Sequence, residues 1–200
     1  MNNVWFTSDF HFGHFNIIRY CDRPFVSSRE MDDVIAERVN ACVKPNDILY
    51  FLGDFCMGRE EQVIAYRKRL ACKTIHFIEG NHDKTTRKQQ QLFASWGLLS
   101  EVHVAQQRIV LCHYAMRVWP HHAQGAWHLY GHSHGNLPDE PFALSLDIGV
   151  DTHDFRPWHF DELRAVMMGE REVRDGKISS ERDAHPATVV GPDQDISALT

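Results

Sequence analysis

The chain has 200 residues, 21 of them Lys or Arg and 27 of them Asp or Glu, which gives a formal net charge of −6 with histidine counted as neutral. This length is typical of a single domain that can bury a core without disulfides. The acidic balance argues against a broad basic face for duplex DNA, and no apolar run approaches the about 20 residues that a membrane-spanning helix needs.

The first half of the chain alternates predicted strands and helices. Residues 4–7, 47–52 and 74–78 are short β-branched and aromatic runs that end in polar residues or glycine, which is typical of strands. Apolar residues recur with helical spacing over 29–43, and helices are also predicted over 60–70 and 84–96.

The second half is rich in strands, which are predicted over 99–105, 108–112, 127–130 and 143–148. A last helix is predicted from Asp161 to about residue 168. The pattern predicts an α/β fold with a parallel part and an antiparallel part. Residues 1–168 are therefore assigned to one domain. The polar residues 169–200 are predicted to form a flexible C-terminal tail.

Side chains that can bind metal stand where five of these strands end. In an open α/β sheet, ligands bind at the carboxyl ends of the strands, so we expect these side chains in one crevice. Each has a plain alternative when taken singly, such as a turn cap or a hydrogen-bonded core histidine. Their coincidence at five strand ends favours a site. The candidate ligands are Asp9, His11, Asp54, Asn81, His113, His132 and His134, and His82 stands beside them.

The types of these residues indicate which metal they suit. Seven oxygen and nitrogen ligands without a thiolate suit Mn²⁺, Fe²⁺ or Zn²⁺. In the pairs Asp9-x-His11 and His132-x-His134, the two side chains face the same way on an extended segment. Glycines flank the ligands, where the backbone must pass close to an ion or adopt positive φ. These glycines are Gly13, Gly53, Gly80, Gly131 and Gly135.

The order of the motifs resembles the calcineurin-like metallophosphoesterase superfamily, whose signature runs D-x-H, G-D, G-N-H-[DE], a lone H and G-H-x-H. The stretches 8–14 and 21–25 resemble a small bacterial and phage subgroup of that superfamily. The matching motifs in this chain are Asp9-Phe10-His11, Gly53-Asp54, Gly80-Asn81-His82-Asp83, His113 and Gly131-His132-Ser133-His134.

The resemblance implies two packed mixed β-sheets flanked by helices. It also implies two divalent metal ions, with Mn²⁺ expected first and Fe²⁺ or Zn²⁺ as alternatives. In that scheme a metal-bridging hydroxide attacks a phosphomonoester or phosphodiester in line, and His82 acts as the general acid. The first ion is held by Asp9, His11 and His134, the second by Asn81, His113 and His132, and Asp54 bridges them.

The substrate is indicated less strongly than the metals. His14 and Arg23 are candidates for contacts with the substrate phosphate, with a structural role as an equal alternative. Lys84, Arg87 and Lys88 form either a solvated face or a guide for an anionic substrate. Acidic charge and small size favour a small phosphorylated partner that resembles a nucleotide. The sequence makes no prediction of oligomeric state.

Two rival functions fit the sequence less well. A metal-dependent amidohydrolase would place its H-x-H pair after the first strand of a barrel of about 250 residues, whereas here the pair comes late and the chain is shorter. A non-catalytic scaffold of the same fold would have lost ligands or the acid, and here all are present. Five cysteines without a C-x-x-C spacing, and no signal peptide, predict a cytoplasmic protein.

Overall fold

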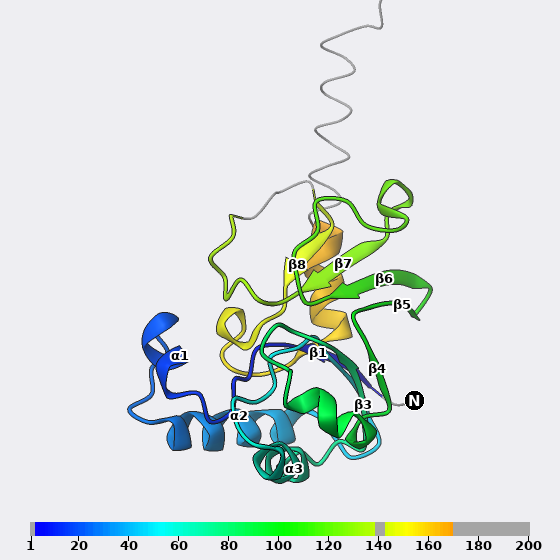
Figure 1. Cartoon of the computed structure of the whole chain (residues 1–200). Helices are drawn as coiled ribbons and strands as arrows, with labels where there is room; N and C mark the ends of the chain where they lie inside the picture. The colour runs from blue at the N-terminus through cyan, green and yellow to red at the C-terminus, as the bar shows by residue number, and fades with distance from the viewer. Residues whose placement is uncertain (1–2, 139–142, 170–200) are drawn as a thin grey trace, which may run out of the picture.

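The computed structural model of the protein describes residues 3–138 and 143–169 (Figure 1). Two β-sheets form its centre, one of five strands in the order β4-β3-β2-β1-β9 and one of four strands in the order β5-β6-β7-β8. Both sheets are mixed, because β9 runs antiparallel to β1 and β5 runs antiparallel to β6, while the other pairs are parallel. The strands are β1 Val4–Thr7, β2 Ile48–Phe51, β3 Thr74–Ile78, β4 Ser95–Gly97, β5 Leu99–Val104, β6 Gln107–Cys112, β7 Trp127–Tyr130, β8 Ser145–Asp147 and β9 Trp158–His159.

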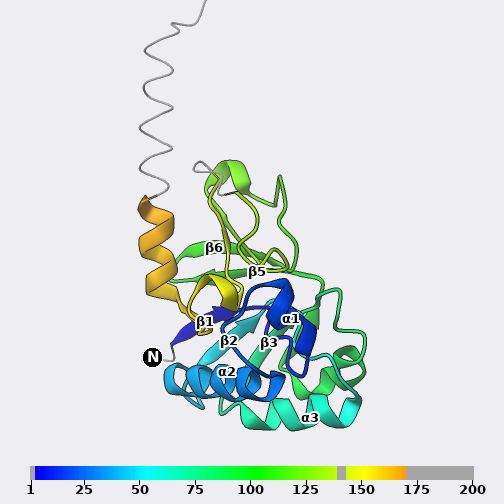
Figure 2. The same cartoon turned by 90° about the vertical axis from the view of Figure 1, so that its left-hand side faces the viewer.

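Helices flank the first sheet on the face that points away from the second sheet. Helices α2 and α3 run along this face, and α1 stands apart at one end of the strands (Figures 1 and 2). Helix α2 begins after Ser27, whose side chain accepts a hydrogen bond from the Glu30 N–H and so caps the helix. The helices are α1 Phe15–Tyr20, α2 Ser28–Cys42, α3 Glu60–Arg69 and the 3₁₀ segments η1 Thr86–Leu92, η2 His122–Gln124 and η3 Val150–Thr152. Residues 160–169 are helical as well.

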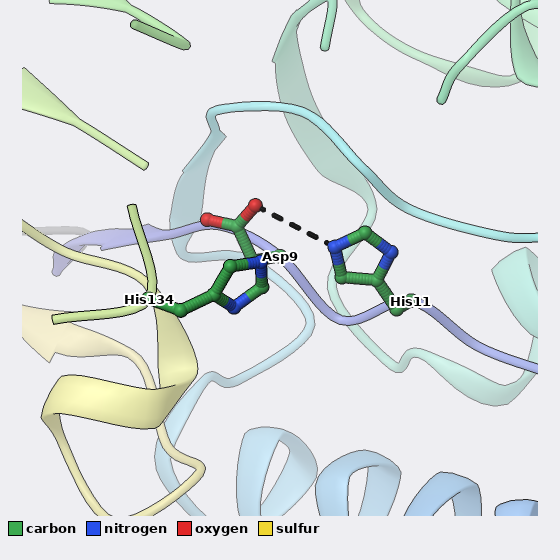
Figure 3. A group of neighbouring side chains, drawn as sticks. All are labelled: Asp9, His11 and His134. Atoms are coloured by element: carbon green, nitrogen blue, oxygen red, sulfur yellow. Dashed lines mark ion pairs between the residues drawn. The ribbon is translucent and has the colours of Figure 1, made fainter. Parts of the chain in front are cut away.

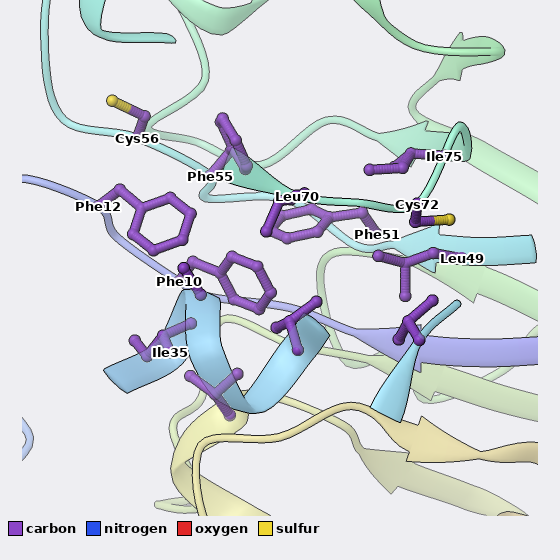
Figure 4. Packing of buried hydrophobic residues seen from close by; sticks show 14 of the residues in the cluster. Phe10, Phe12, Ile35, Leu49, Phe51, Phe55, Cys56, Leu70, Cys72 and Ile75 are labelled. Carbon is purple, nitrogen blue, oxygen red and sulfur yellow. The ribbon is translucent and has the colours of Figure 1, made fainter. Parts of the chain in front are cut away.

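Two hydrophobic cores hold these layers together. The first lies between α2, α3 and the first sheet and includes Ile35 of α2, Leu49 and Phe51 of β2, and several buried phenylalanine rings (Figure 4). The second includes Phe6 of the first sheet, Leu129 of the second sheet and residues of the segment 160–169. Alternate residues of β2 point to opposite faces, which is why one strand serves both cores.

The two mixed sheets with their flanking helices confirm the predicted fold. The helix predicted over 84–96 is wrong. Residues 82–85 form a turn, η1 is a 3₁₀ segment with a non-helical residue at Gln89, and Ser95 begins an edge strand. The Asp83 carboxylate accepts backbone N–H groups from the neighbouring loop, which holds this segment as a turn rather than a helix. The predicted tail, apart from its first residue, lies outside the described residues.

In the described part of the chain, no helix is both long and apolar enough to cross a membrane.

Candidate metal centre

The predicted ligands come together at the carboxyl ends of the strands. Strands β1, β2 and β3 are parallel to one another, as are β6 and β7, so the loops that follow them meet at one edge of the molecule. These loops form two groups of ligand atoms, and within each group all atoms lie within 4.8 Å of one another. The first cluster is Asp9, His11 and His134, drawn in Figure 3, and the second cluster is Asp54, His113 and His132.

Asp54 lies between the two clusters. Its Oδ2 atom is 3.5 Å from His11 Nε2 and also 3.5 Å from His113 Nε2. Its other oxygen, Oδ1, accepts the His82 backbone N–H at 2.9 Å, which holds the carboxylate in place. Burial raises the pKa of Asp54, but the hydrogen bond and charge of His113, with His11, hold it at about 2. One ionised carboxylate oxygen thus faces both histidine rings.

Several buried polar atoms of the first cluster have no hydrogen-bond partner among the described residues. They are Asp9 Oδ1 and both ring nitrogens of His11. Asp9 is 0% exposed and His11 is 1% exposed, so water does not compensate for the missing partners. Buried polar atoms without partners are costly and call for an explanation. Burial keeps the pKa of His11 well below its usual value, so its ring is neutral and offers a lone pair to a cation.

The backbone is strained at the same positions. Five of the seven predicted ligands have positive φ although none is glycine, with values of 62° at Asp9, 52° at His11, 60° at Asp54, 67° at His132 and 49° at His134. Such residues cost about 1–3 kcal/mol each and persist where the surrounding structure over-determines them, often at functional sites. The residue types alone did not predict this backbone strain.

Two of the predicted glycines are needed because other groups approach them closely. A Cβ atom at Gly131 would lie 2.1 Å from Ser8 Oγ and 2.3 Å from Asp9 Oδ2. A Cβ atom at Gly80 would lie 2.2 Å from Asp54 Oδ1. The missing side chains therefore leave room for the carboxylates of both clusters.

Hydrogen bonds orient His113 and bring Asn81 to the second cluster. His113 Nδ1 donates to the carbonyl oxygen of Leu52 at 2.7 Å, so this nitrogen carries the proton. His113 Nε2 is left to face the site, 3.1 Å from Asn81 Oδ1. A second bond from the far side of the ring is the usual way in which proteins orient a ligand histidine.

The Arg23 side chain is buried and hydrogen-bonded within the protein. Its side chain is 0% exposed, and its guanidinium donates to Asp151 and to the carbonyl oxygens of Asp9 and Phe10. Of the two alternatives, the structure favours the structural one, because every hydrogen bond of the side chain is directed into the protein.

Two acidic residues contribute to the site although sequence reasoning gave them no role. Asp151 accepts a hydrogen bond from His134 Nδ1 at 2.6 Å. Asp83 accepts the backbone N–H groups of Asp54, Phe55 and Gly80 at 2.7, 3.0 and 2.8 Å. Asp83 was visible as the last position of the G-N-H-[DE] motif, whereas Asp151 had no signal of its own.

His82 and His14 border the clusters without belonging to them. The ring centroid of His82 is 5.4 Å from that of His11 and 6.3 Å from that of His14. His82 is exposed to solvent, whereas His14 is half-buried. Nearby, Lys88 pairs with Glu60 and Arg87 pairs with Glu79, which leaves Lys84 as the cation of this group without a described ion pair. The solvated-face alternative fits these three residues better than a guide for anions.

A cavity of about 620 Å³ lies beside the second sheet and contains none of the predicted ligands. Met116, Trp119 and Tyr130 line part of it. The chain connects it to the site, since Tyr130 comes two residues before His132. The groups that can bind a metal ion lie in the two polar clusters and not in this cavity.

Known proteins share both the sequence pattern and the fold. The sequence model of the calcineurin-like phosphoesterases matches residues 3–161. An uncharacterized protein of Methanocaldococcus jannaschii is 30% identical over 180 residues, which cover 87% of this chain and 96% of the relative. The gene 66 protein of Mycobacterium phage D29 is 26% identical in an alignment that covers 84% of this chain and 96% of that protein.

Among solved structures, a protein of unknown function from Aquifex aeolicus is similar in fold, with a TM-score of 0.67 and 22% sequence identity. The similarity covers 83% of this chain and 100% of that protein. The family match extends over well more than half of the chain and includes every loop that supplies a predicted ligand. The chain therefore belongs to the calcineurin-like phosphoesterase family.

Proposed function

We propose that this protein is a dinuclear metal-dependent hydrolase of phosphate esters that acts on a phosphomonoester or phosphodiester with a nucleotide-like group. The observation that carries the proposal is the position of Asp54 Oδ2, 3.5 Å from a histidine nitrogen of each cluster. A carboxylate between two sets of nitrogen and oxygen donors suits a pair of divalent ions better than a single ion.

The residues present fit such a pair. Asp9, His11 and His134 would hold one ion, and Asn81, His113 and His132 would hold the other, with Asp54 contacting both. The buried atoms of Asp9 and His11 that have no hydrogen-bond partner are the groups that a cation would satisfy. Imidazole and carboxylate donors favour Mn²⁺, with Fe²⁺ or Zn²⁺ as alternatives. When bound, two divalent ions lower the pKa of water and stabilise negative charge on the phosphoryl oxygens during an in-line displacement.

His82 is the best-placed proton donor in the proposed reaction. The loop that carries it is fixed by the hydrogen bond from its backbone N–H to Asp54, while its ring lies at the open side of the site. As the bond between phosphorus and the leaving oxygen breaks, the electron pair goes to that oxygen and His82 supplies the proton. His14, half-buried beside it, is proposed to orient the substrate.

Two exposed tyrosines support a substrate with a planar group. Tyr114 is 45% exposed, and its ring centroid lies 4.8 Å from that of His132. Tyr20 is 63% exposed, and its ring centroid lies 6.4 Å from that of His14. One ring thus borders the second cluster and the other borders the His14 and His82 side. Aromatic rings next to a phosphate site favour bases that stack on them.

A screen of metals against substrates tests the proposal. The chain would be stripped of metal with a chelator and assayed with Mn²⁺, Fe²⁺, Zn²⁺ or Mg²⁺ on p-nitrophenyl phosphate, bis-p-nitrophenyl phosphate, nucleoside monophosphates and cyclic nucleotides. We expect hydrolysis only after metal is restored, and faster turnover of nucleotides by the wild type than by Tyr114→Ala. Binding of metal without hydrolysis of any ester would instead favour the non-catalytic scaffold.

We also propose a cytoplasmic location. All five cysteines are free in the structure, which supports a reducing compartment.

A further inference from the structure

One buried arginine connects two ligands of the first cluster. The Arg23 Nη2 atom donates to the Asp9 carbonyl oxygen at 2.7 Å, and Nη1 donates to the Phe10 carbonyl oxygen at 3.1 Å. The guanidinium therefore holds the strained backbone of a ligand that has a φ of 62°. Arginine suits this task because its planar fork donates in several fixed directions at once.

The same guanidinium reaches His134 through Asp151. Arg23 Nε donates to Asp151 Oδ1 at 2.7 Å, and Nη2 donates to Oδ2 at 2.8 Å. Asp151 Oδ2 in turn accepts the proton of His134 Nδ1 at 2.6 Å. This bond leaves the other ring nitrogen of His134 directed toward Asp9, as Figure 3 shows. A carboxylate behind a ligand histidine fixes both the orientation and the tautomer of the ring.

An alternative interpretation is that Asp151 and His134 belong to a third metal site. Cys21, His134 and Asp151 bring ligand atoms within 4.8 Å of one another. However, Arg23 already donates to both carboxylate oxygens of Asp151, so a cation there would have to displace a buried guanidinium. The geometry disfavours that exchange, because the displaced charge would lose its partner in a buried position.

We infer that the Arg23–Asp151 ion pair is a positioning device for the first cluster and sets its metal affinity separately from that of the second cluster. The pair holds the backbone of Asp9 and the ring of His134, whereas no hydrogen bond in the described part of the chain joins it to Asp54, His113 or His132. The metal part of this inference rests on the proposed function. Neither Arg23 nor Asp151 contacts the substrate in this scheme.

The test compares Asp151→Asn with the wild type by calorimetric titration of Mn²⁺ into metal-stripped protein. Loss of an outer partner of a ligand histidine typically weakens metal affinity about 10–100-fold. We expect this loss for one of two ions in Asp151→Asn and no change for the other. Glu162→Gln is the matched control, because it breaks the pair of Glu162 with Arg156, at 2.9 Å, away from the ligands. Its two affinities should equal those of the wild type.

A second variant guards against a simple folding defect, since Asp151→Asn leaves the Arg23 charge buried without its partner. The double variant Arg23→Met with Asp151→Asn removes both charges and should show the same selective loss. Two ions bound with wild-type affinity in either variant, or equal weakening of both ions, would overturn the inference.

A readout without metal separates this inference from the proposed function. The proton on His134 Nδ1 should give a slowly exchanging downfield NMR signal in the metal-free wild type and in Glu162→Gln, and lose it in Asp151→Asn. If the wild type bound no Mn²⁺, the proposed function would fail, and the NMR signal would still decide whether Asp151 orients His134. Retention of an unshifted signal in Asp151→Asn would overturn the positioning role.

Discussion

His82 neighbours both clusters, yet its side chain belongs to neither of them. We predict that His82→Ala retains both metal ions and loses far more activity on an alkyl or nucleoside ester than on a p-nitrophenyl ester. An alkoxide needs a proton to leave, whereas p-nitrophenolate does not, and general acid catalysis contributes about 10²–10⁴-fold. Steady-state rates on the two ester types, together with elemental analysis, measure this difference.

The control for His82 is its neighbour His14, whose ring centroid lies 6.3 Å away. A residue that only orients the substrate should lower both rates alike, and this is the result we expect for His14→Ala. Equal losses on both esters in His82→Ala, with metal content unchanged, would rule out the acid role.

Asp54 supports a second prediction at the residue scale. Because its Oδ2 faces a histidine of each cluster, Asp54→Ala should lower the metal content of both sites. His11→Ala should mainly affect one site, since His11 groups with the first cluster. Elemental analysis of the dialysed variants distinguishes the two patterns. Two ions per chain in Asp54→Ala would contradict a bridging position.

At the residue scale, the sequence predicted the candidate ligands better than the residues that hold those ligands in place. The ligands stand at strand ends, where short motifs announce them, and the structure brings them together; their role as ligands stays a prediction. The partnership of Arg23 with Asp151 spans 128 positions and follows no periodic pattern. Only the folded chain shows that Arg23 faces inward, which favours the structural role that the sequence left open as an equal alternative to substrate contact.

Among the elements, those with their own sequence periodicity were predicted closely. The predicted strands 74–78 and 127–130 coincide with β3 and β7, and α2 begins one residue before its predicted start. Helix α1, strand β4 and strand β9 were missed because they have six, three and two residues, too few for a pattern to emerge. Such short pieces are stabilised by their neighbours in the fold rather than by local propensity.

The helical segment 160–169 offers a prediction about stability. Leu163 is 0% exposed in the second core, whereas Met168 on the same segment is 45% exposed. Leu163→Ala should lower the free energy of unfolding by about 2–5 kcal/mol, through lost burial and the cavity that remains. Met168→Ala, the matched control, should change it by less than about 0.5 kcal/mol. Urea denaturation of metal-free protein measures both, and equal stabilities would show that this segment does not hold the core.

In the whole molecule, the site depends on both sheets. Asp9, His11 and Asp54 follow strands of the first sheet, and His113 and His132 follow strands of the second. A bound ion would therefore link loops from two separately paired sheets. Charge supports the same arrangement, because two divalent ions would make the site positive and attractive to phosphate within a chain of net charge −6.

This link predicts how metal affects the whole protein. Chelation should abolish turnover and lower the melting temperature, and Mn²⁺ should restore both at least as well as Mg²⁺, which imidazole ligands suit poorly. A ligand that binds only the folded state adds about 2.7 kcal/mol of stability at 100 times its Kd, so the melting temperature should rise with Mn²⁺ concentration. Asp54→Ala is the control, and Mn²⁺ should stabilise it much less. Full activity with Mg²⁺ alone and none with Mn²⁺ would contradict the histidine-rich centre. A melting temperature that does not change with any metal would contradict a metal link between the sheets.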